Sequence, residues 1–157
     1  MRIIRTIITL SSLSLIAACG GPADNATVPE AEPAGASFVD IGNHVVHFSA
    51  QTTDNLPLEV AQTYNISRNP YSAMLNVSVL EKGTNRAVTA DVAVKTVNLT
   101  GQLKDVTMRM IREQEAIYYI GVTDVANMET LIFDISVRPD GVEAATDVRF
   151  KRQFYTN

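Results

Sequence analysis

Cysteine, histidine and tryptophan are the scarce residues of this 157-residue chain, which has one cysteine, two histidines and no tryptophan. A lone cysteine excludes a disulfide within one chain, so the fold must be held together by its apolar core. The chain also contains no GxSxG, GxGxxG, HExxH or CxxC motif. The sequence therefore gives no support to a nucleophile elbow, a dinucleotide site or a zinc site of these kinds.

A long hydrophobic run is also missing. The uncharged run Thr6–Ala18 has 13 residues, whereas a membrane-spanning helix needs roughly 20. Because Arg2 and Arg5 precede it, this run has the charged and apolar regions of a secretory signal. The residues from Ile16 to Gly20, IAACG, resemble a bacterial lipobox, in which the cysteine receives a lipid and becomes the mature N-terminus.

We therefore expect residues 1–18 to be a lipoprotein signal peptide and Cys19 to be the lipid attachment site. The alternative is an ordinary signal peptide whose cysteine lies near the cleavage site by chance. Because Gly20 rather than aspartate follows the cysteine, the predicted location is the outer membrane, facing the periplasm. Residues 19–36 contain several Gly, Pro and acidic residues and no aromatic residue, a composition that favours a flexible tether.

Positive charge is in deficit. In the predicted mature chain, 11 Lys and Arg residues stand against 17 Asp and Glu, a formal charge of −6. We expect no nucleic-acid partner, because phosphate contacts need basic side chains. Residues 37–157 have the usual length of a single domain.

Period-two alternation of apolar and polar residues dominates residues 37–157 and predicts strands. Turn signals such as Pro139-Asp140-Gly141 separate the alternating runs at lengths that allow antiparallel pairing. The fold class is therefore all-β: a two-layer immunoglobulin-like sandwich of about seven antiparallel strands with one short helix. The predicted strands are Val45–Ala50, Ala73–Leu80, Val88–Lys95, Val106–Arg112, Ala116–Thr123, Leu131–Val137 and Val148–Tyr155.

One face of each strand is expected to build the core. The predicted inward residues are Val46, Phe48, Leu75, Val77, Val79, Val88, Val92, Val94, Met108, Met110, Ile117, Tyr119, Leu131, Phe133, Ile135, Val137, Phe150 and Phe154.

The segment Asn55–Asn65 breaks the strand pattern and predicts the short helix. Pro57 suits a first helical turn, and Asn65 tolerates the left-handed conformation that ends a helix. Leu56, Val60 and Tyr64 recur at a spacing of four, which gives the helix one apolar face. We expect this face to dock across an open end of the sandwich.

The two histidines, His44 and His47, are the first candidates for chemistry. On a strand, residues three apart point to opposite faces, so a shared metal ion is not expected. We predict no metal and no cofactor. Glu113 and Glu115 fall in a predicted hairpin turn, where water screens their charge, and solubility is their expected role.

Tyr118 and Tyr119 are adjacent on a strand, so one should enter the core and the other face outward. An outward tyrosine beside Arg109 or Arg112 of the neighbouring strand forms an aromatic and cationic patch, of the kind that binds a partner or a sugar. The alternative is ordinary cross-strand packing. These four residues are the candidate binding patch.

Several sequence stretches together resemble a family of small exported proteins of Gram-negative bacteria, catalogued as domain of unknown function 4426. They are Pro57-x-x-Val60-Ala61-x-x-Tyr64 followed by Ile66 and Arg68, then Gly101-Gln102, Ile117-Tyr118-Tyr119 and Phe154-Tyr155. The resemblance covers about residues 37–157. It implies bacterial export and one small domain, and it implies no activity and no catalytic residue.

The expected function is a non-enzymatic, lipid-anchored envelope protein whose sandwich binds or scaffolds an envelope protein or glycan. The membrane is a partner through the N-terminal lipid. A small-ligand or carbohydrate-binding module is the alternative, and a concave apolar patch with converging polar groups would favour it. A hydrolase built on His44 or His47 is the third reading, and the sequence leaves open whether the predicted helix covers a pocket.

Overall fold

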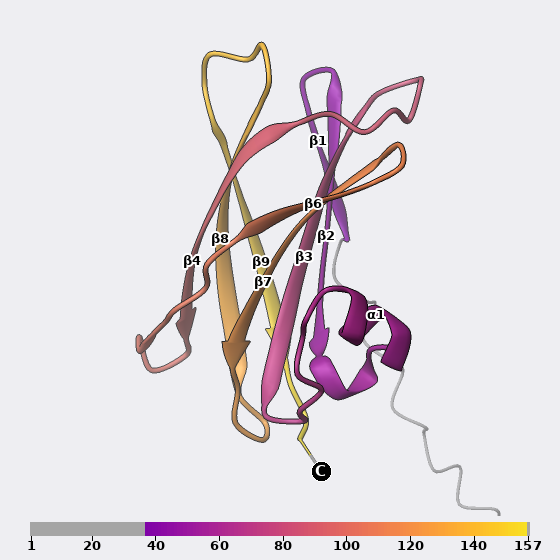
Figure 1. Ribbon diagram of the computed structural model, residues 1–157. Helices are drawn as coiled ribbons and strands as arrows, with labels where there is room; N and C mark the ends of the chain where they lie inside the picture. The colour runs from indigo at the N-terminus through magenta and orange to yellow at the C-terminus, as the bar shows by residue number, and fades with distance from the viewer. Residues whose placement is uncertain (1–36, 157) are drawn as a thin grey trace, which may run out of the picture. The chain divides into compact units, whose positions relative to one another are not determined.

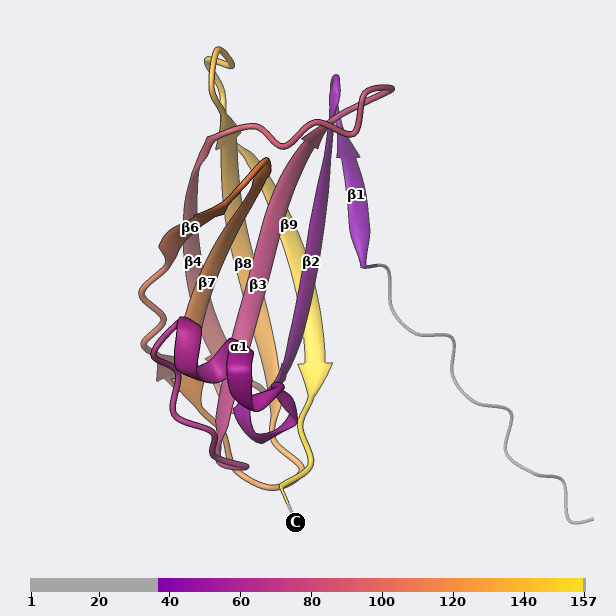
Figure 2. The same ribbon diagram turned by 45° about the vertical axis from the view of Figure 1, so that its right-hand side comes forward.

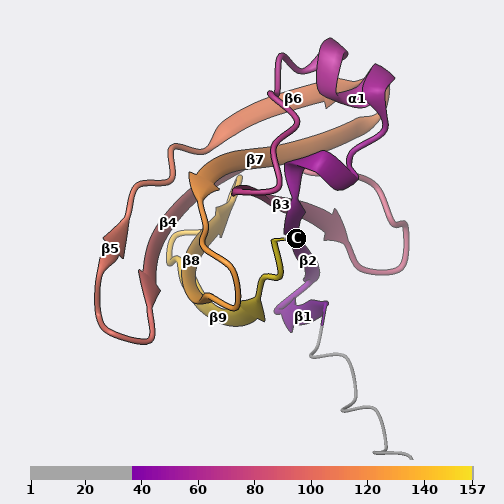
Figure 3. The ribbon, with the colours of Figure 1, turned by 90° about the horizontal axis from the view of Figure 1, so that it is seen from below.

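Two antiparallel sheets and one short helix make up the domain in a computed structural model, which describes residues 37–156. The five-stranded sheet has the order β1-β2-β3-β7-β6, and the four-stranded sheet has the order β5-β4-β8-β9. Figures 1 and 3 show the two sheets stacked as the layers of a sandwich. The elements are β1 (Phe38–Ile41), β2 (His44–Thr52), the 3-10 turn η1 (Thr53–Asn55), α1 (Leu58–Thr63), β3 (Ser72–Glu81), β4 (Ala90–Asn98), β5 (Leu103–Lys104), β6 (Arg109–Glu113), β7 (Ala116–Asp124), β8 (Thr130–Pro139) and β9 (Thr146–Gln153).

The predicted all-β, two-layer antiparallel sandwich with one short helix is confirmed. The predicted number of strands is wrong, because the described residues form nine strands rather than seven. The two unpredicted strands are β1, with four residues, and β5, with two. Both are edge strands, and runs this short carry too little alternation to predict a strand.

The core lies between the sheets and contains the predicted inward residues with one exception. Phe133 lies at its centre, and its ring centroid is 5.8 Å from that of Phe150, which in turn lies 5.1 Å from that of Phe48. The exception is Met110, which is 52% exposed. It lies on β6, the outermost strand of its sheet, where the opposite sheet does not cover it.

The predicted strand Val106–Arg112 begins later than expected, at Arg109. Residues 106–108 instead cross close to Gly121 of β7. A Cβ added at Gly121 would lie 2.5 Å from Cγ1 of Val106 and 2.7 Å from Sδ of Met108. The missing side chain therefore makes room for these residues, which pack there instead of pairing with β7.

The helix α1 forms where it was predicted, but its predicted docking position is wrong. It lies against the outer face of the five-stranded sheet, over β3 and β7 (Figure 2), rather than across an open end of the sandwich. Leu56, Ala61 and Ile66 pack there against Ile120 of β7 in a second apolar cluster. As expected, Asn65 ends the helix in the left-handed region, with φ of 50°.

Thr53, whose side chain is fully buried, joins the two ends of the loop that carries α1. Its Oγ1 lies 2.8 Å from the carbonyl oxygen of Ser67 and accepts a hydrogen bond of 2.9 Å from the N–H of Asn69. The hydroxyl thereby closes the loop that carries α1 and fixes the helix on the sheet. In residues 37–156, no helix is long and apolar enough to cross a membrane.

Candidate functional site

The four residues of the predicted binding patch lie on two different faces of the five-stranded sheet. In the β6–β7 register, Ile111 faces Tyr118 and Met110 faces Tyr119. Tyr118 therefore points to the outer face, whereas Tyr119 enters the core, as the alternation predicts. By the same alternation, Arg109 shares the outer face with Tyr118, and Arg112 lies on the inner side with Tyr119.

Tyr119 joins the two sheets. Its phenolic oxygen accepts a hydrogen bond of 2.7 Å from the N–H of Ala90 in β4, and burial raises the pKa of Tyr119. Because this hydroxyl is engaged inside the protein, Tyr119 contributes to the sandwich itself.

Arg109 holds the helix in place. Its guanidinium donates a hydrogen bond to the carbonyl oxygen of Tyr64, the residue that follows α1. A cation at the C-terminal end of a helix also opposes the negative end of the helix dipole. Arg109 is therefore a positioning residue for the outer-face structure around Tyr118.

A pocket of about 230 Å³ lies between α1 and the outer face of the five-stranded sheet. The helix thus does cover a pocket, the point that the sequence leaves open. The helix side contributes two lining residues, and strands β3, β6 and β7 contribute two each. We call it the outer-face pocket, and its lining residues are Val60, Tyr64, Met74, Asn76, Ile111, Glu113, Tyr118 and Ile120.

The walls of the outer-face pocket are mainly apolar, with a few polar groups among them. The carboxylate of Glu113 beside the phenol of Tyr64 raises the pKa of Tyr64 to about 12. The side-chain oxygen of Asn76 is buried and finds no hydrogen-bond partner within residues 37–156. An apolar cavity with a small number of placed polar groups is the common form of a small-molecule site.

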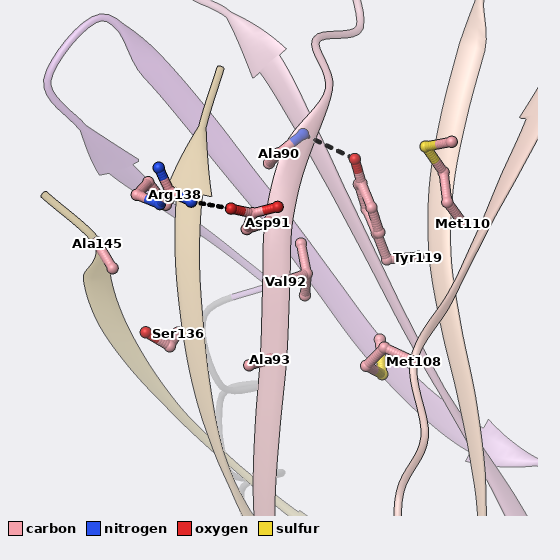
Figure 4. Close-up of a pocket in the computed structure, with 10 residues that line it drawn as sticks. All are labelled: Ala90, Asp91, Val92, Ala93, Met108, Met110, Tyr119, Ser136, Arg138 and Ala145. Carbon is pink, nitrogen blue, oxygen red and sulfur yellow. Dashed lines mark hydrogen bonds and ion pairs between the residues drawn. The ribbon is translucent and has the colours of Figure 1, made fainter. Parts of the chain in front are cut away.

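A second, wider groove of about 530 Å³ lies along β4 and is shown in Figure 4. Met108, Met110 and Tyr119 line it on one side, and residues of β8 line it on the other. Its charged groups and its tyrosine hydroxyl already have partners, since Arg138 forms an ion pair with Asp91, and the hydroxyl oxygen of Tyr119 is bonded to the N–H of Ala90. The outer-face pocket, with its unpartnered oxygen, is the stronger candidate site.

The histidines lie apart from both sites. His44 shares the inner side of β2 with Val46, whereas His47 is on the opposite side and packs against Phe38, with 5.8 Å between the ring centroids. The described part of the chain holds no group of three or more His, Cys, Asp or Glu side chains arranged for a metal ion. Cys19, the signal peptide and the predicted tether lie outside the described residues.

Sequence reasoning missed three of the pocket's polar residues: Tyr64, Asn76 and Glu113. Glu113 was expected in a hairpin turn, but it is the last residue of β6, and the turn is Gln114-Glu115. One signal in the sequence does point here. The run Ile117–Ile120 is apolar or aromatic at every position, which indicates a strand covered on both faces.

The fold and the site together define a class: a small two-sheet β-sandwich with a helix-covered pocket on one outer face. Residues 38–157 match the model of the family described as domain of unknown function, DUF4426. The chain belongs to this family, as its sequence motifs suggest.

One solved structure of the same family agrees with this assignment. A DUF4426 family protein, PA0388 from Pseudomonas aeruginosa PAO1, is 28% identical and superposes with a TM-score of 0.67 over 76% of this chain and 94% of that chain. Two structures of FetP from uropathogenic Escherichia coli are 8% identical. The copper-bound variant of FetP superposes with a TM-score of 0.56 over 76% of this chain and 95% of that chain. The FetP isolated after expression in the periplasm superposes with a TM-score of 0.55 over 76% of this chain and 93% of that chain. The FetP matches share the fold alone. No curated protein matches.

Proposed function

We propose that this protein is a lipid-anchored, periplasm-facing envelope protein that binds another envelope component without catalysing a reaction. The observation that carries the proposal is the outer-face pocket, where apolar walls surround the Tyr64–Glu113 pair and the unpartnered oxygen of Asn76. This is the concave apolar patch with converging polar groups that favours a small-ligand or carbohydrate-binding module.

The anchoring part of the proposal rests on the lipobox-like sequence that ends in Cys19-Gly20. FetP, which shares the fold, was produced in a periplasm. A Cys19→Ala change should leave the precursor unprocessed or release soluble protein, because no thiol remains to take the lipid. Cell fractionation with immunoblotting measures this, and globomycin treatment of the native protein should also leave the precursor unprocessed. Normal processing and membrane retention of Cys19→Ala would contradict lipid anchoring.

The binding part is tested by filling the pocket. Val60 lines the pocket from α1, and Leu58, two residues earlier on the same helix, is 58% exposed and does not line it. A Val60→Trp variant should lose binding to any glycan or peptidoglycan fragment that the native protein binds in a ligand-observed NMR screen. A Leu58→Trp variant should keep it. Equal binding by the two variants would place the ligand elsewhere.

The non-enzymatic part rests on the separation of the two histidines on opposite sides of β2. Each histidine would need its own nucleophile and carboxylate for triad chemistry. His44→Ala and His47→Ala variants should therefore bind as the native protein does. If the native protein converted a ligand to product and either variant did not, the proposal that the protein is not an enzyme would be overturned.

A further inference from the structure

We propose that the outer-face pocket selects a ligand that carries a protonated amine; this deepens the proposed function and rests on it. The argument uses the charge of the lining residues, the kind of hydrogen-bonding atoms that remain available, and the size of the pocket.

The ionisable groups of the pocket favour a cation. Glu113 is the one carboxylate among the lining residues, and none of them is Lys, Arg or His. Arg109, a basic side chain on this face, is bonded to the carbonyl oxygen of Tyr64. A ligand carboxylate or phosphate would meet Glu113 without a basic lining residue to compensate, whereas an ammonium group would meet an opposite charge.

Two of the polar groups in the lining can accept hydrogen bonds from a ligand amine. The side-chain oxygen of Asn76 is buried without a partner in the described chain. The Glu113 carboxylate lies beside Tyr64, and when it is ionised its two oxygens act only as acceptors. An ammonium group has three N–H donors and no acceptor, so it fits this set of atoms.

Two aromatic rings add to the preference of the pocket for a cation. Tyr64 and Tyr118 both line the pocket. The face of a tyrosine ring attracts a cation, and the attraction strengthens where water is excluded. A carboxylate beside two tyrosines is thus suited to an organic cation.

The size and the remaining walls limit the rest of the ligand. The volume of about 230 Å³ is below the usual range for drug-sized ligands. Val60, Met74, Ile111 and Ile120 offer apolar contact to a ring or a short chain. The ligand class is therefore a compact amine, such as an amino sugar or a small cyclic amine.

Matched pairs of probes test the amine directly. Glucosamine and N-acetylglucosamine have the same ring, but only glucosamine carries a cationic nitrogen; cyclohexylamine and cyclohexanol form a second pair. With the full-length protein purified in detergent, calorimetry should give each amine about tenfold tighter binding than its neutral partner, about 1.4 kcal/mol from the Glu113 carboxylate and the two tyrosine rings together. Equal binding within a pair would overturn the amine proposal and leave the binding function standing.

Variants place the effect at Glu113. Glu113→Gln should reduce the preference for each amine to about twofold or less, because the charge is removed and the size is kept. Glu115→Gln, in the turn two residues later and outside the pocket lining, should keep the full preference. Near-UV circular dichroism checks that both variants are folded. An unchanged preference in Glu113→Gln would overturn the proposal, as would the absence of binding by all four probes. In that last case, the glycan screen with Val60→Trp decides the binding function separately.

Discussion

The two outer faces of the sandwich are built differently, although their inner faces share one core. The outer face of the five-stranded sheet carries apolar residues on β7 and is covered by α1. The outer face of the four-stranded sheet carries ion pairs between neighbouring strands, Asp91 with Arg138 and Asp134 with Arg149. No helix covers this second face in the described part of the chain, as Figures 1 and 2 show.

This difference between the two outer faces distinguishes features that stabilise the sandwich from features that build the candidate site. A sandwich is stable when the two inner faces are apolar, and its outer faces can be polar. The four-stranded sheet follows this pattern, with Asp134 and Ser136 pointing outward between buried residues of β8. The helix, the second apolar cluster and the outer-face pocket are therefore additions to one side only, which is the pattern expected of a binding surface.

The largest effect should come from the apolar cluster beneath the helix. Leu56 is 3% exposed and Leu58 is 58% exposed. Leu56→Ala should lower the free energy of unfolding by about 2–5 kcal/mol, because it opens a cavity. Leu58→Ala should change it by about 0.5 kcal/mol or less. Urea unfolding measures both, and equal losses would mean that the covered face is not a packed cluster.

A smaller effect should come from the hydroxyl that closes the loop carrying the helix. Thr53→Val keeps the shape of the side chain but leaves the N–H of Asn69 without its acceptor. The expected loss is about 1–3 kcal/mol, the cost of an unsatisfied buried donor. The same change at exposed Thr63 should have an effect within about 0.5 kcal/mol. If Thr53→Val and Thr63→Val lowered the free energy of unfolding equally in urea, the Thr53 hydroxyl would not fix the loop that carries α1.

The smallest effect should come from the uncovered face. The hydrogen bond from Arg149 lowers the pKa of Asp134, so the pair adds stability above the ordinary pKa of an aspartate, about 4. This contribution should disappear as the pH falls through the lowered pKa of Asp134. Because the Arg149 side chain is 73% exposed and that of Asp134 is 36% exposed, water screens the pair, and Arg149→Ala should affect stability less than either substitution on the covered side. Unfolding curves at pH 7 and pH 2 test this, and a larger loss at pH 2 would contradict the assignment.

The core was predictable because alternation along one strand is a local property of the sequence. Residues such as Phe133 and Val77 are buried whatever strand lies beside them. The position of Met110 was not predictable in this way, since its exposure depends on β6 being the last strand of its sheet.

The site was harder to predict because strand order assembles it. Asn76 lies beside Ile120, and Ile111 beside Tyr118, only because β3, β7 and β6 are neighbours. The outward orientation of Tyr118 follows from the sequence, as does the existence of the helix. The docking of α1 on the outer face does not, since the apolar stripe of a short helix fits several surfaces.

The hydrogen bond from Ala90 to Tyr119 has a consequence for following the motion of this domain. It runs from a backbone N–H of one layer to a side chain of the other, whereas strand pairing protects amides within a layer. The amide proton of Ala90 exchanges with solvent when this contact between the layers opens. Its exchange rate therefore reports how often the two sheets separate. Fraying within either sheet is measured by the amides that pair strands inside that sheet.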